Sequence, residues 1–508
     1  MVHPEKVDGT RSEIEAAIET FSDGIAPVDT LHGDEAAKVL KDYTGEKTWL
    51  QHEEKLVRRK IDIRLLPVLC ATYGLQYYDK AMLSQAALFG LRKDLGLEAG
   101  NKYSFCASIF YLGFIVGAYP AILLAQRFPI ERVAAATVLL WGICLICTAA
   151  CGSWKAIFAQ RFFLGLLESG ISPMFMMVVG QFYKKDEQAL RMGVWYCATG
   201  YVSIVSPLIN YGLGHIKGSL SPWRYMYIVA GAVTILWSAV ILYFLPPDPI
   251  RCRGLSDRER YIAVARLQTN NTGVRNTHFK KDQGIELLSD LRFWLLFCAT
   301  FLMLIANGPV STFVPLIIHN MGYGTLHSLL LLTPIGAIIG TLQLGSCYAA
   351  YKLARARCYL AIICETGTIL ACLLLWRLPA NATGGLLFGA YILAANSAAY
   401  AILMGMQLAN TAGYTKRSLA SSGLFVGYCA GNFVGPLLFK SSDAPRYAPG
   451  FIAVFITACV SALLIFIYRV CCVWENRNRD KSGTMEGFEH AYEDNFTDRT
   501  NKQFRYLY

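Results

Sequence analysis

Two opposite charges lie in an apolar segment of the chain. The stretch FAQRFFLGLLESGISPM, residues 158–174, contains Arg161 and Glu168 among phenylalanine, leucine, isoleucine and methionine. In an α-helix, positions seven apart lie within about 20° of one face and about 10 Å apart along the axis. The two side chains are too far apart to pair directly, but both can face a partner or water. A guanidinium can bind a carboxylate through two hydrogen bonds, and a partly dehydrated carboxyl group can load and release a proton.

A second pair of charges lies in another apolar segment. LQYYDKAMLSQ, residues 75–85, contains Asp79 and Lys80 side by side. A charge at the centre of a membrane-spanning helix costs about 2.5–3.5 kcal/mol, so such residues usually face a protein interior or a water-filled cavity. Three interpretations are open. The charges handle a substrate and protons, they form a network that only holds helices together, or Lys80 extends its amino group to the membrane surface.

The elements that carry these residues are predicted to be membrane-spanning helices. Of 508 residues, 54% are hydrophobic and 16% are charged, whereas soluble proteins contain about 25% charged residues. A helix needs about 20 apolar residues to cross the hydrocarbon core, and it satisfies its own backbone groups there. The sequence therefore predicts an all-α membrane protein with twelve transmembrane helices. The apolar runs lie near 65–89, 104–126, 131–151, 156–180, 189–213, 223–245, 291–318, 326–350, 358–377, 383–407, 419–439 and 449–473.

A long polar and basic connection divides these runs into six and six. The predicted organisation is a polar N-terminal segment (1–54), an N-terminal six-helix half (55–245), a linker (246–290), a C-terminal six-helix half (291–473) and a C-terminal tail (474–508). The tail is charged and aromatic, and this composition predicts disorder. Two six-helix halves joined by a linker are typical of transporters that bind substrate at the membrane midplane between them.

The loops indicate the orientation and a weak internal repeat. YKKDEQALRMG (183–193) precedes a run with Pro207, and YTKRSLASSG (414–423) precedes a run with Pro436. Lysine and arginine accumulate in alternate loops, which predicts that these loops, the linker and both termini are cytoplasmic. The net charge of +11 is explained by this asymmetry rather than by nucleic-acid binding.

The second half offers milder polar residues. Asn307 and Asn432 are the candidates for substrate contact, because glycine and proline neighbours loosen the backbone around them. The alternative is that such amides only hydrogen-bond neighbouring helices, which contributes about 0.6 kcal/mol each. The same alternative applies to the other polar residues in these runs, which are Gln343, Glu365, Asn396 and Gln407.

The sequence argues against metal and cofactor chemistry. Its eight histidines form no cluster of the kind that diiron or zinc membrane enzymes require. Cys144, Cys147 and Cys151 lie close together, but no histidine or carboxylate accompanies them. We therefore expect no enzyme activity, no cofactor, no metal site and no nucleic-acid partner.

Several longer stretches resemble the major facilitator superfamily and, more narrowly, the fungal anion:cation symporters typified by allantoate permease. They include LQYYDKAML, RFFLGLLESGISPM, SPWRYMYIVAG and NTAGYTKRSLASSGLFVGYCAGNFVGPLLFKSSDAPRYAPGF, and the resemblance runs from about 55 to 475. It implies that Asp79 and Glu168 take part in proton coupling and that Lys80 and Arg161 face an anionic substrate. Lysine at position 80 departs from the usual arginine and supplies a point charge in place of a fork. AQRFPIER lacks the usual aspartate of that loop.

These features together predict a proton-coupled carrier that takes up a small organic anion by alternating access. The resemblance implies a carboxylate such as a vitamin, an allantoate-like nitrogen source or a small peptide, and a monomer in a fungal plasma membrane. Its expected partners are the anion, protons and membrane lipid. The alternatives are a carrier or exporter of a secondary metabolite and a nutrient receptor that has a transporter fold but moves no substrate.

Overall fold

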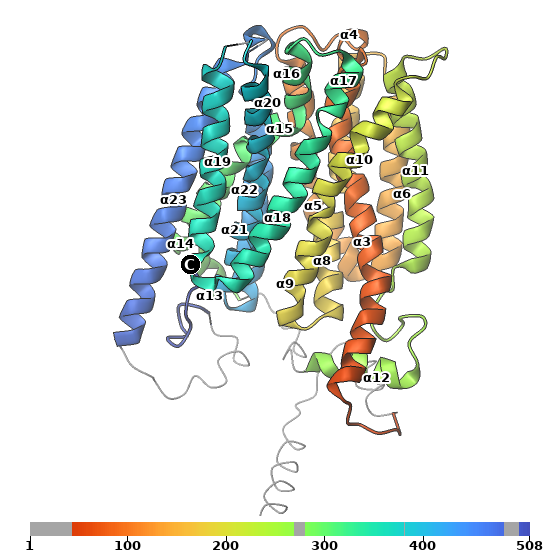
Figure 1. The fold of residues 1–508 in the computed structure, drawn as a ribbon. Coiled ribbons are helices and arrows are strands. Elements are labelled where there is room, and N and C mark those ends of the chain that lie inside the picture. Colours follow the sequence, from red (N-terminus) through yellow and green to blue (C-terminus); the bar gives the residue numbers. More distant parts are fainter. Residues whose placement is uncertain (1–42, 269–279, 380, 445, 482–496) are drawn as a thin grey trace, which may run out of the picture.

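The computed structural model describes residues 43–268, 280–379, 381–444, 446–481 and 497–508, and every regular element in these ranges is a helix. Long, nearly parallel helices form a bundle with two ends (Figure 1). We call them the α4 end, where α4 (Leu91–Asp94) lies, and the α12 end, where α12 (Asp257–Gln268) lies.

The first group of helices is called the N-terminal half below. α7 and α8 follow each other across Ser169 and Gly170, and α9 and α10 follow each other across Cys197. Its bundle helices are α3 (Gln51–Ala87), α5 (Lys102–Arg127), α6 (Ile130–Thr148), α7 (Trp154–Glu168), α8 (Ile171–Phe182), α9 (Lys185–Tyr196), α10 (Ala198–Leu213) and α11 (Pro222–Phe244).

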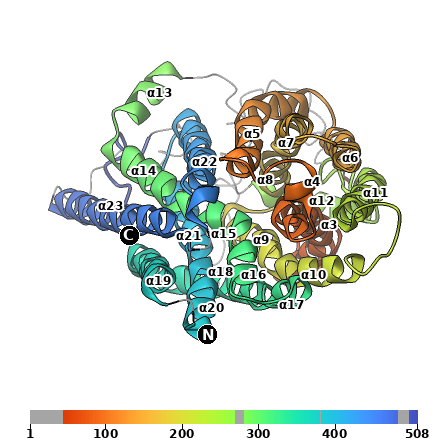
Figure 2. The same cartoon turned by 90° about the horizontal axis from the view of Figure 1, so that it is seen from above.

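The second group is called the C-terminal half, and Figure 2 shows α14, α19 and α23 on the side away from α6 and α11. The short helix α13 (Lys281–Leu288) precedes it at the α12 end. Its members are α14 (Leu291–Ile305), α15 (Asn307–Thr312), α16 (Val314–Asn320), α17 (Thr325–Leu330), α18 (Thr333–Lys352), α19 (Arg357–Arg377), α20 (Thr383–Ile392), α21 (Asn396–Asn410), α22 (Tyr414–Leu437) and α23 (Ala448–Lys481).

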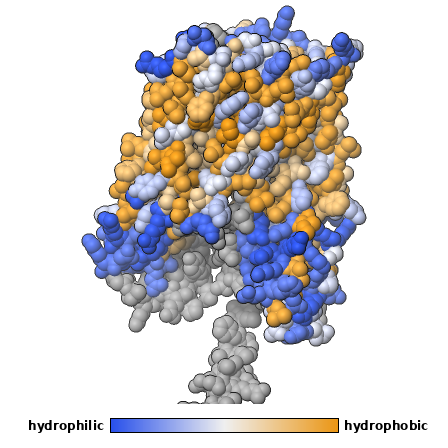
Figure 3. All heavy atoms as spheres, viewed as in Figure 1, coloured by the Kyte–Doolittle hydropathy of each residue, from blue (hydrophilic) through white to orange (hydrophobic). Residues whose placement is uncertain are grey.

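Many of these helices can cross a membrane. Within the described residues, nine helical stretches are long and apolar enough, several of them made of successive helices such as α7 and α8. A tenth is added if α13 and α14, bent by 64°, are taken as one span. Figure 3 shows the corresponding hydrophobic band between two hydrophilic ends. The predicted all-α membrane fold is confirmed, but the number twelve stays a prediction, because α3 and α22 are too polar to pass the same test.

Glycines allow close helix crossings at two places that position the site. A Cβ atom on Gly165 of α7 would lie 2.0 Å from the Phe110 carbonyl oxygen of α5. A Cβ atom on Gly200 of α10 would lie 2.3 Å from the backbone nitrogen of Gly340 in α18. Only glycine permits these approaches. The first fixes the helix that carries Arg161 and Glu168, and the second brings the two halves together at the α10–α18 interface.

The halves also meet near the α4 end through polar contacts. The Tyr103 hydroxyl of α5 donates a hydrogen bond to the carbonyl oxygen of Thr312 at 3.2 Å. The neighbouring Ser104 hydroxyl donates to the carbonyl oxygen of Phe439 at 2.7 Å. Tyr103, Ser104 and Phe439 are all buried, so this end of the bundle is sealed by side chains from both halves.

The C-terminal tail corrects one sequence-based prediction. Residues 474–481 continue α23, and the described segment Thr497–Tyr508 packs against the C-terminal half. Asp498 pairs with Lys416 at 2.8 Å, and Tyr506 is buried. The prediction of disorder was therefore wrong for these two segments. A charged tail is expected to stay disordered when its charges remain hydrated. In this tail Asp498 instead pairs with basic residues of the bundle, and this pairing favours a docked segment.

Candidate functional site

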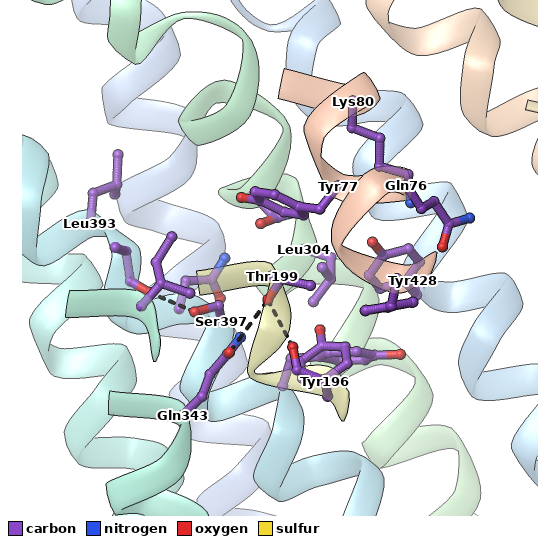
Figure 4. Close-up of a pocket in the computed structure, with 16 residues that line it drawn as sticks. Gln76, Tyr77, Lys80, Tyr196, Thr199, Leu304, Gln343, Leu393, Ser397 and Tyr428 are labelled. Atoms are coloured by element: carbon purple, nitrogen blue, oxygen red, sulfur yellow. Dashed lines mark hydrogen bonds between the residues drawn. The ribbon is translucent and has the colours of Figure 1, made fainter. Parts of the chain in front are cut away.

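A cavity lies between the two halves, and Figure 4 shows the side chains that line it. It encloses about 640 Å³ of space not filled by protein atoms, including its opening. Helices α3, α9 and α10 form its wall from the N-terminal half. From the C-terminal half the wall is formed by α14, α15, α18, α21, α22 and the short turn η2 (Leu393–Ala395). Such a cavity is the expected place for a substrate in a carrier with two halves.

Lys80 is the charged side chain in the lining of this cavity. Its amino nitrogen lies 4.8 Å from the centre of the Phe114 ring and 5.5 Å from that of Phe110. Among the described residues it forms no hydrogen bond or ion pair. The two rings stabilise the cation from one side, by about 0.5–2 kcal/mol each in such contacts. The amino group therefore lies at the central cavity, not at the membrane surface, and remains open to an anion.

Asp79 and Glu168 lie behind the cavity wall. Both side chains are 0% exposed, and neither lines the cavity. Within the described part of the chain, none of their four carboxylate oxygens has a hydrogen-bond partner. The charges of Lys80 and Arg161 act on both groups. Two buried acids thus share an interior with two bases, without a direct ion pair among the described residues.

Gln76 connects this buried cluster to the cavity. It lines the cavity, and its amide nitrogen donates to the backbone oxygen of Glu168 at 3.0 Å. Glu168 is the last residue of α7, where a helix leaves carbonyl oxygens without an intrahelical donor. The contact therefore caps α7 and holds the end that carries Glu168 against α3.

Arg161 lies inside the N-terminal half. It is 2% exposed, and its Nη2 donates to the Tyr227 hydroxyl of α11 at 2.9 Å. It does not line the cavity. The sequence predicted a direct contact between Arg161 and the substrate, but in this conformation Arg161 does not face the cavity. The tyrosine partner was missed in the sequence, because nothing in SPWRYMYIVAG shows which of its residues faces α7.

The two candidate asparagines meet each other. The Asn307 amide nitrogen donates to the Asn432 side-chain oxygen at 2.7 Å, and the Asn432 amide nitrogen donates to the Tyr428 carbonyl at 2.9 Å. Asn307 lines the cavity, whereas Asn432 lies behind it and is 0% exposed. The pair links the start of α15 to α22. In this conformation Asn432 therefore hydrogen-bonds a neighbouring helix and does not face the cavity.

Tyrosines form the largest group that sequence reasoning missed. Tyr196 of α9, Tyr400 of α21 and Tyr428 of α22 line the cavity, and their ring centres are 6.3 Å and 5.1 Å apart in succession. No hydrogen bond of their three hydroxyl groups is found among the described residues. Tyr73 and Tyr77 line the cavity from α3. The two adjacent tyrosines in LQYYDK, next to Asp79 and Lys80, were the sequence signal that could have indicated a tyrosine-lined cavity. The signal is weak, because tyrosine is common in apolar segments.

One polar contact crosses the cavity floor between the halves. The Thr199 hydroxyl of α10 donates to the Gln343 side-chain oxygen of α18 at 3.4 Å, as Figure 4 shows. It lies one residue from the close glycine contact at Gly200. Among the described residues, the lining thus contains the Lys80 cation, several tyrosines, amides and a few apolar side chains, whereas Asp79, Glu168 and Arg161 are not part of it.

This arrangement of two helical halves about a central polar cavity is that of a membrane carrier, and the sequence comparison supports it. The family model described as Major Facilitator Superfamily matches residues 69–436. The chain belongs to this superfamily, as its motifs indicated.

Within the superfamily the chain groups with fungal transporters, which confirms the narrower resemblance. It is 32% identical to the allantoate permease of Saccharomyces cerevisiae over 495 residues, which cover 93% of this chain and 90% of the relative. It is 32% identical to a thiamine pathway transporter of the same yeast, over 89% of this chain and 86% of the relative. An uncharacterized transporter of Schizosaccharomyces pombe is 35% identical over 94% of this chain and 90% of its own length.

Solved structures show the same fold at lower sequence identity. The xylose transporter XylE from E. coli, in a partially occluded inward open conformation, matches with a TM-score of 0.60 and 15% identity, over 80% of this chain and 97% of that chain. A bacterial homologue of the human lysosomal transporter Spinster also matches with a TM-score of 0.60 and 15% identity, over 83% and 98% of the two chains. The protein is a multi-pass membrane transporter of this superfamily.

Proposed function

We propose that the protein takes up a small organic anion together with protons, by alternating access of a cavity between its two halves. The observation that carries this proposal is Lys80, a cation in the cavity lining without a hydrogen bond or ion pair among the described residues. A partly buried cation at a cavity wall favours an anionic ligand, because few other groups compensate its lost hydration. We assign the carboxylate of the substrate to this amino group.

Charge balance supports the coupling to protons. When all four groups are ionised, Asp79 and Glu168 carry two negative charges and Lys80 and Arg161 carry two positive charges. An anion at Lys80 adds one negative charge to a region of low polarity, and a proton on one of the two carboxylates restores neutrality. Binding of the anion and binding of the proton therefore favour each other, and this coupling is reciprocal. The pair Asp79 and Glu168 is our candidate for the proton site.

Arg161 has a different role in this scheme from the one its sequence position suggested. Its charge acts on Glu168 from inside the N-terminal half, while Tyr227 holds its guanidinium. We therefore assign Arg161 to the charge balance of the proton site, and Lys80 to the anion. Asn307 and the cavity tyrosines would supply hydrogen bonds and flat surfaces to the body of the substrate.

Among the described residues that line the cavity, Lys80 is the one charged side chain, and this narrows the class of substrate. A monocarboxylate would be matched by Lys80, whereas a dicarboxylate would leave one charge uncompensated and a cation would meet no carboxylate in the lining. We therefore propose a monoanion. We also propose a fungal plasma membrane as the setting, with the α12 end, both termini and the linker in the cytoplasm.

The test is uptake of labelled monocarboxylates into proteoliposomes, with and without an inward proton gradient. We expect uptake that rises with the gradient, a loss of uptake in Lys80→Met and retention of most activity in Lys80→Arg. Uptake that ignores the gradient would contradict the coupling. Binding without uptake would favour a nutrient receptor, and gradient-driven efflux would favour an exporter.

A further inference from the structure

We propose that the C-terminal segment Thr497–Tyr508 is a latch that holds the α12-end parts of α21 and α22, and that a negative charge added at Thr497 opens it. The proposal assumes the transporter described above but does not depend on its substrate. It rests on three sets of contacts between this segment and the C-terminal half.

The first set consists of hydrogen bonds between side-chain amides of the bundle and the backbone of the segment. The Asn410 side chain, at the end of α21, donates to the Leu507 carbonyl and accepts from the Leu507 N–H, both at 2.7 Å. The Asn476 side chain of α23 makes the same two contacts with Tyr506, at 2.8 Å and 2.9 Å. Two amides that each pair with both backbone groups of one residue hold the segment in a defined register.

The second set is electrostatic. Asp498 pairs with Lys416 of α22 at 2.8 Å and with Arg292 of α14 at 3.5 Å. Lys416 is only 1% exposed, so this ion pair is buried. Tyr506 is 2% exposed, and the guanidinium carbon of Arg292 lies 4.0 Å from the centre of its ring. A segment held by a buried ion pair and a buried aromatic ring is part of the folded half.

The third set identifies where the latch can be opened. The Thr497 hydroxyl donates to Glu286 of α13 at 2.9 Å, and Thr497 is buried beside Asp498. Three carboxylates, those of Glu286, Asp290 and Asp498, already surround Lys416. A further negative charge on Thr497, such as a phosphoryl group, replaces a donor with an anion next to them. Repulsion and the lost hydrogen bond would then release the segment.

The latch is connected to the cavity through two helices. α21 contains Asn410 and, about 15 Å away along its axis, Tyr400. α22 contains Lys416 and, about 18 Å away, Tyr428. Both tyrosines line the cavity. Docking of the segment therefore restrains the two helices that present these rings, and its release lets their α12-end parts move more freely.

The test is amide hydrogen exchange of the full-length protein in Thr497→Glu and Asp498→Asn. Lys502→Gln is the control for Thr497→Glu, because it also makes the chain more negative by one unit, but at an exposed position of the same segment. We expect exchange at Tyr506 and Leu507 to rise at least tenfold in both variants, with a smaller rise in α21 and α22, and no change in the control. Unchanged exchange at Tyr506 and Leu507 would overturn the latch. A rise there without any change in α21 and α22 would overturn its link to the cavity. Neither result depends on transport, so a failure of the proposed substrate or coupling would leave this test intact.

Discussion

The two halves of the bundle bury different kinds of polar group near the cavity. The N-terminal half contributes ionisable side chains, namely Asp79, Glu168 and Arg161. The C-terminal half contributes mainly amides, such as the hydrogen-bonded Asn307 and Asn432. It also buries one carboxyl group, that of Glu365 in α19, which has no hydrogen-bond partner among the described residues. Ionised groups in a region of low polarity are stabilised by opposite charges nearby, as in the cluster of the N-terminal half. Amides satisfy one another at lower cost. The difference suggests that the N-terminal half handles charge and protons, while the C-terminal half binds the body of the substrate.

At the α12 end, each half contains a cluster of ion pairs. The residue at the centre of the cluster is an acid in the N-terminal half and a base in the C-terminal half. In the N-terminal half, Glu187 lies at the centre and pairs with Arg58 and Arg266. In the C-terminal half, Lys416 lies at the centre and pairs with Asp290 and Asp498. Glu187 and Lys416 belong to the two echoing segments YKKDEQALRMG and YTKRSLASSG. The two echoing segments thus each supply the centre of an ion-pair cluster, with a negative centre in the N-terminal half and a positive centre in the C-terminal half.

The largest effect is expected from removing a charge in the N-terminal half. Arg161→Ala leaves Glu168 and Asp79 with one base fewer and removes the partner of the Tyr227 hydroxyl. Breaking one side of a buried charge network costs about 3–5 kcal/mol, so uptake should fall about 100-fold or more and the melting temperature should drop. Arg161→Lys keeps the charge and should lose much less. Uptake by Arg161→Ala at the wild-type rate would show that the buried charges are not coupled.

An intermediate effect is expected from the charge of the ligand. Competition between matched monocarboxylates and dicarboxylates should favour the monocarboxylate by about tenfold or more, because an unpaired buried charge loses at least one charged hydrogen bond of about 1.5–3 kcal/mol. Lys80→Met should abolish this preference together with binding. Equal inhibition by both ligand types would indicate a second cation at the site.

A smaller effect is expected from the amides of the C-terminal half. Asn307→Leu, Asn432→Leu and the double variant form a cycle that isolates their mutual hydrogen bond. Such bonds between membrane helices contribute about 0.6 kcal/mol on average, so each single variant should change uptake only a few-fold and keep its dependence on the proton gradient. If either asparagine variant lost this dependence, the division between the halves would be wrong.

The sequence predicted the membrane fold, the superfamily and the burial of Arg161 and Glu168. These follow from apolar run lengths, motif strings and charges in apolar segments. It did not predict the Tyr227 partner of Arg161 or the docked tail, because both depend on how helices distant in sequence pack. Aromatic rings and amides inside a span look the same in sequence whether they face a cavity or a neighbouring helix. The roles of all six candidate residues stay predictions; these residues are Asp79, Lys80, Arg161, Glu168, Asn307 and Asn432.

The smallest effect concerns Asp290 at the α12 end. Burial raises the pKa of its carboxyl group, but Arg292 and Lys416 outweigh burial and hold this pKa below its usual value. A lowered folded-state pKa gives stability that is present above the unfolded pKa of about 3.9 and is lost as the pH falls through the folded value. The melting temperature of the wild type should therefore decrease below about pH 4, by a small amount because the shift per kcal/mol falls with chain length. Asp290→Asn should flatten this decrease, and an unchanged pH profile in that variant would contradict the assignment.

The most direct test of the central claim is simultaneous measurement of anion uptake and proton influx in proteoliposomes that contain the wild type, Glu168→Gln or Asp79→Asn. We expect the wild type to move protons only when a transported monocarboxylate is present. At least one of the two variants should bind the anion but lose proton influx and the acceleration of uptake by the gradient. Proton-coupled uptake that survives in both variants and in their combination would contradict the account.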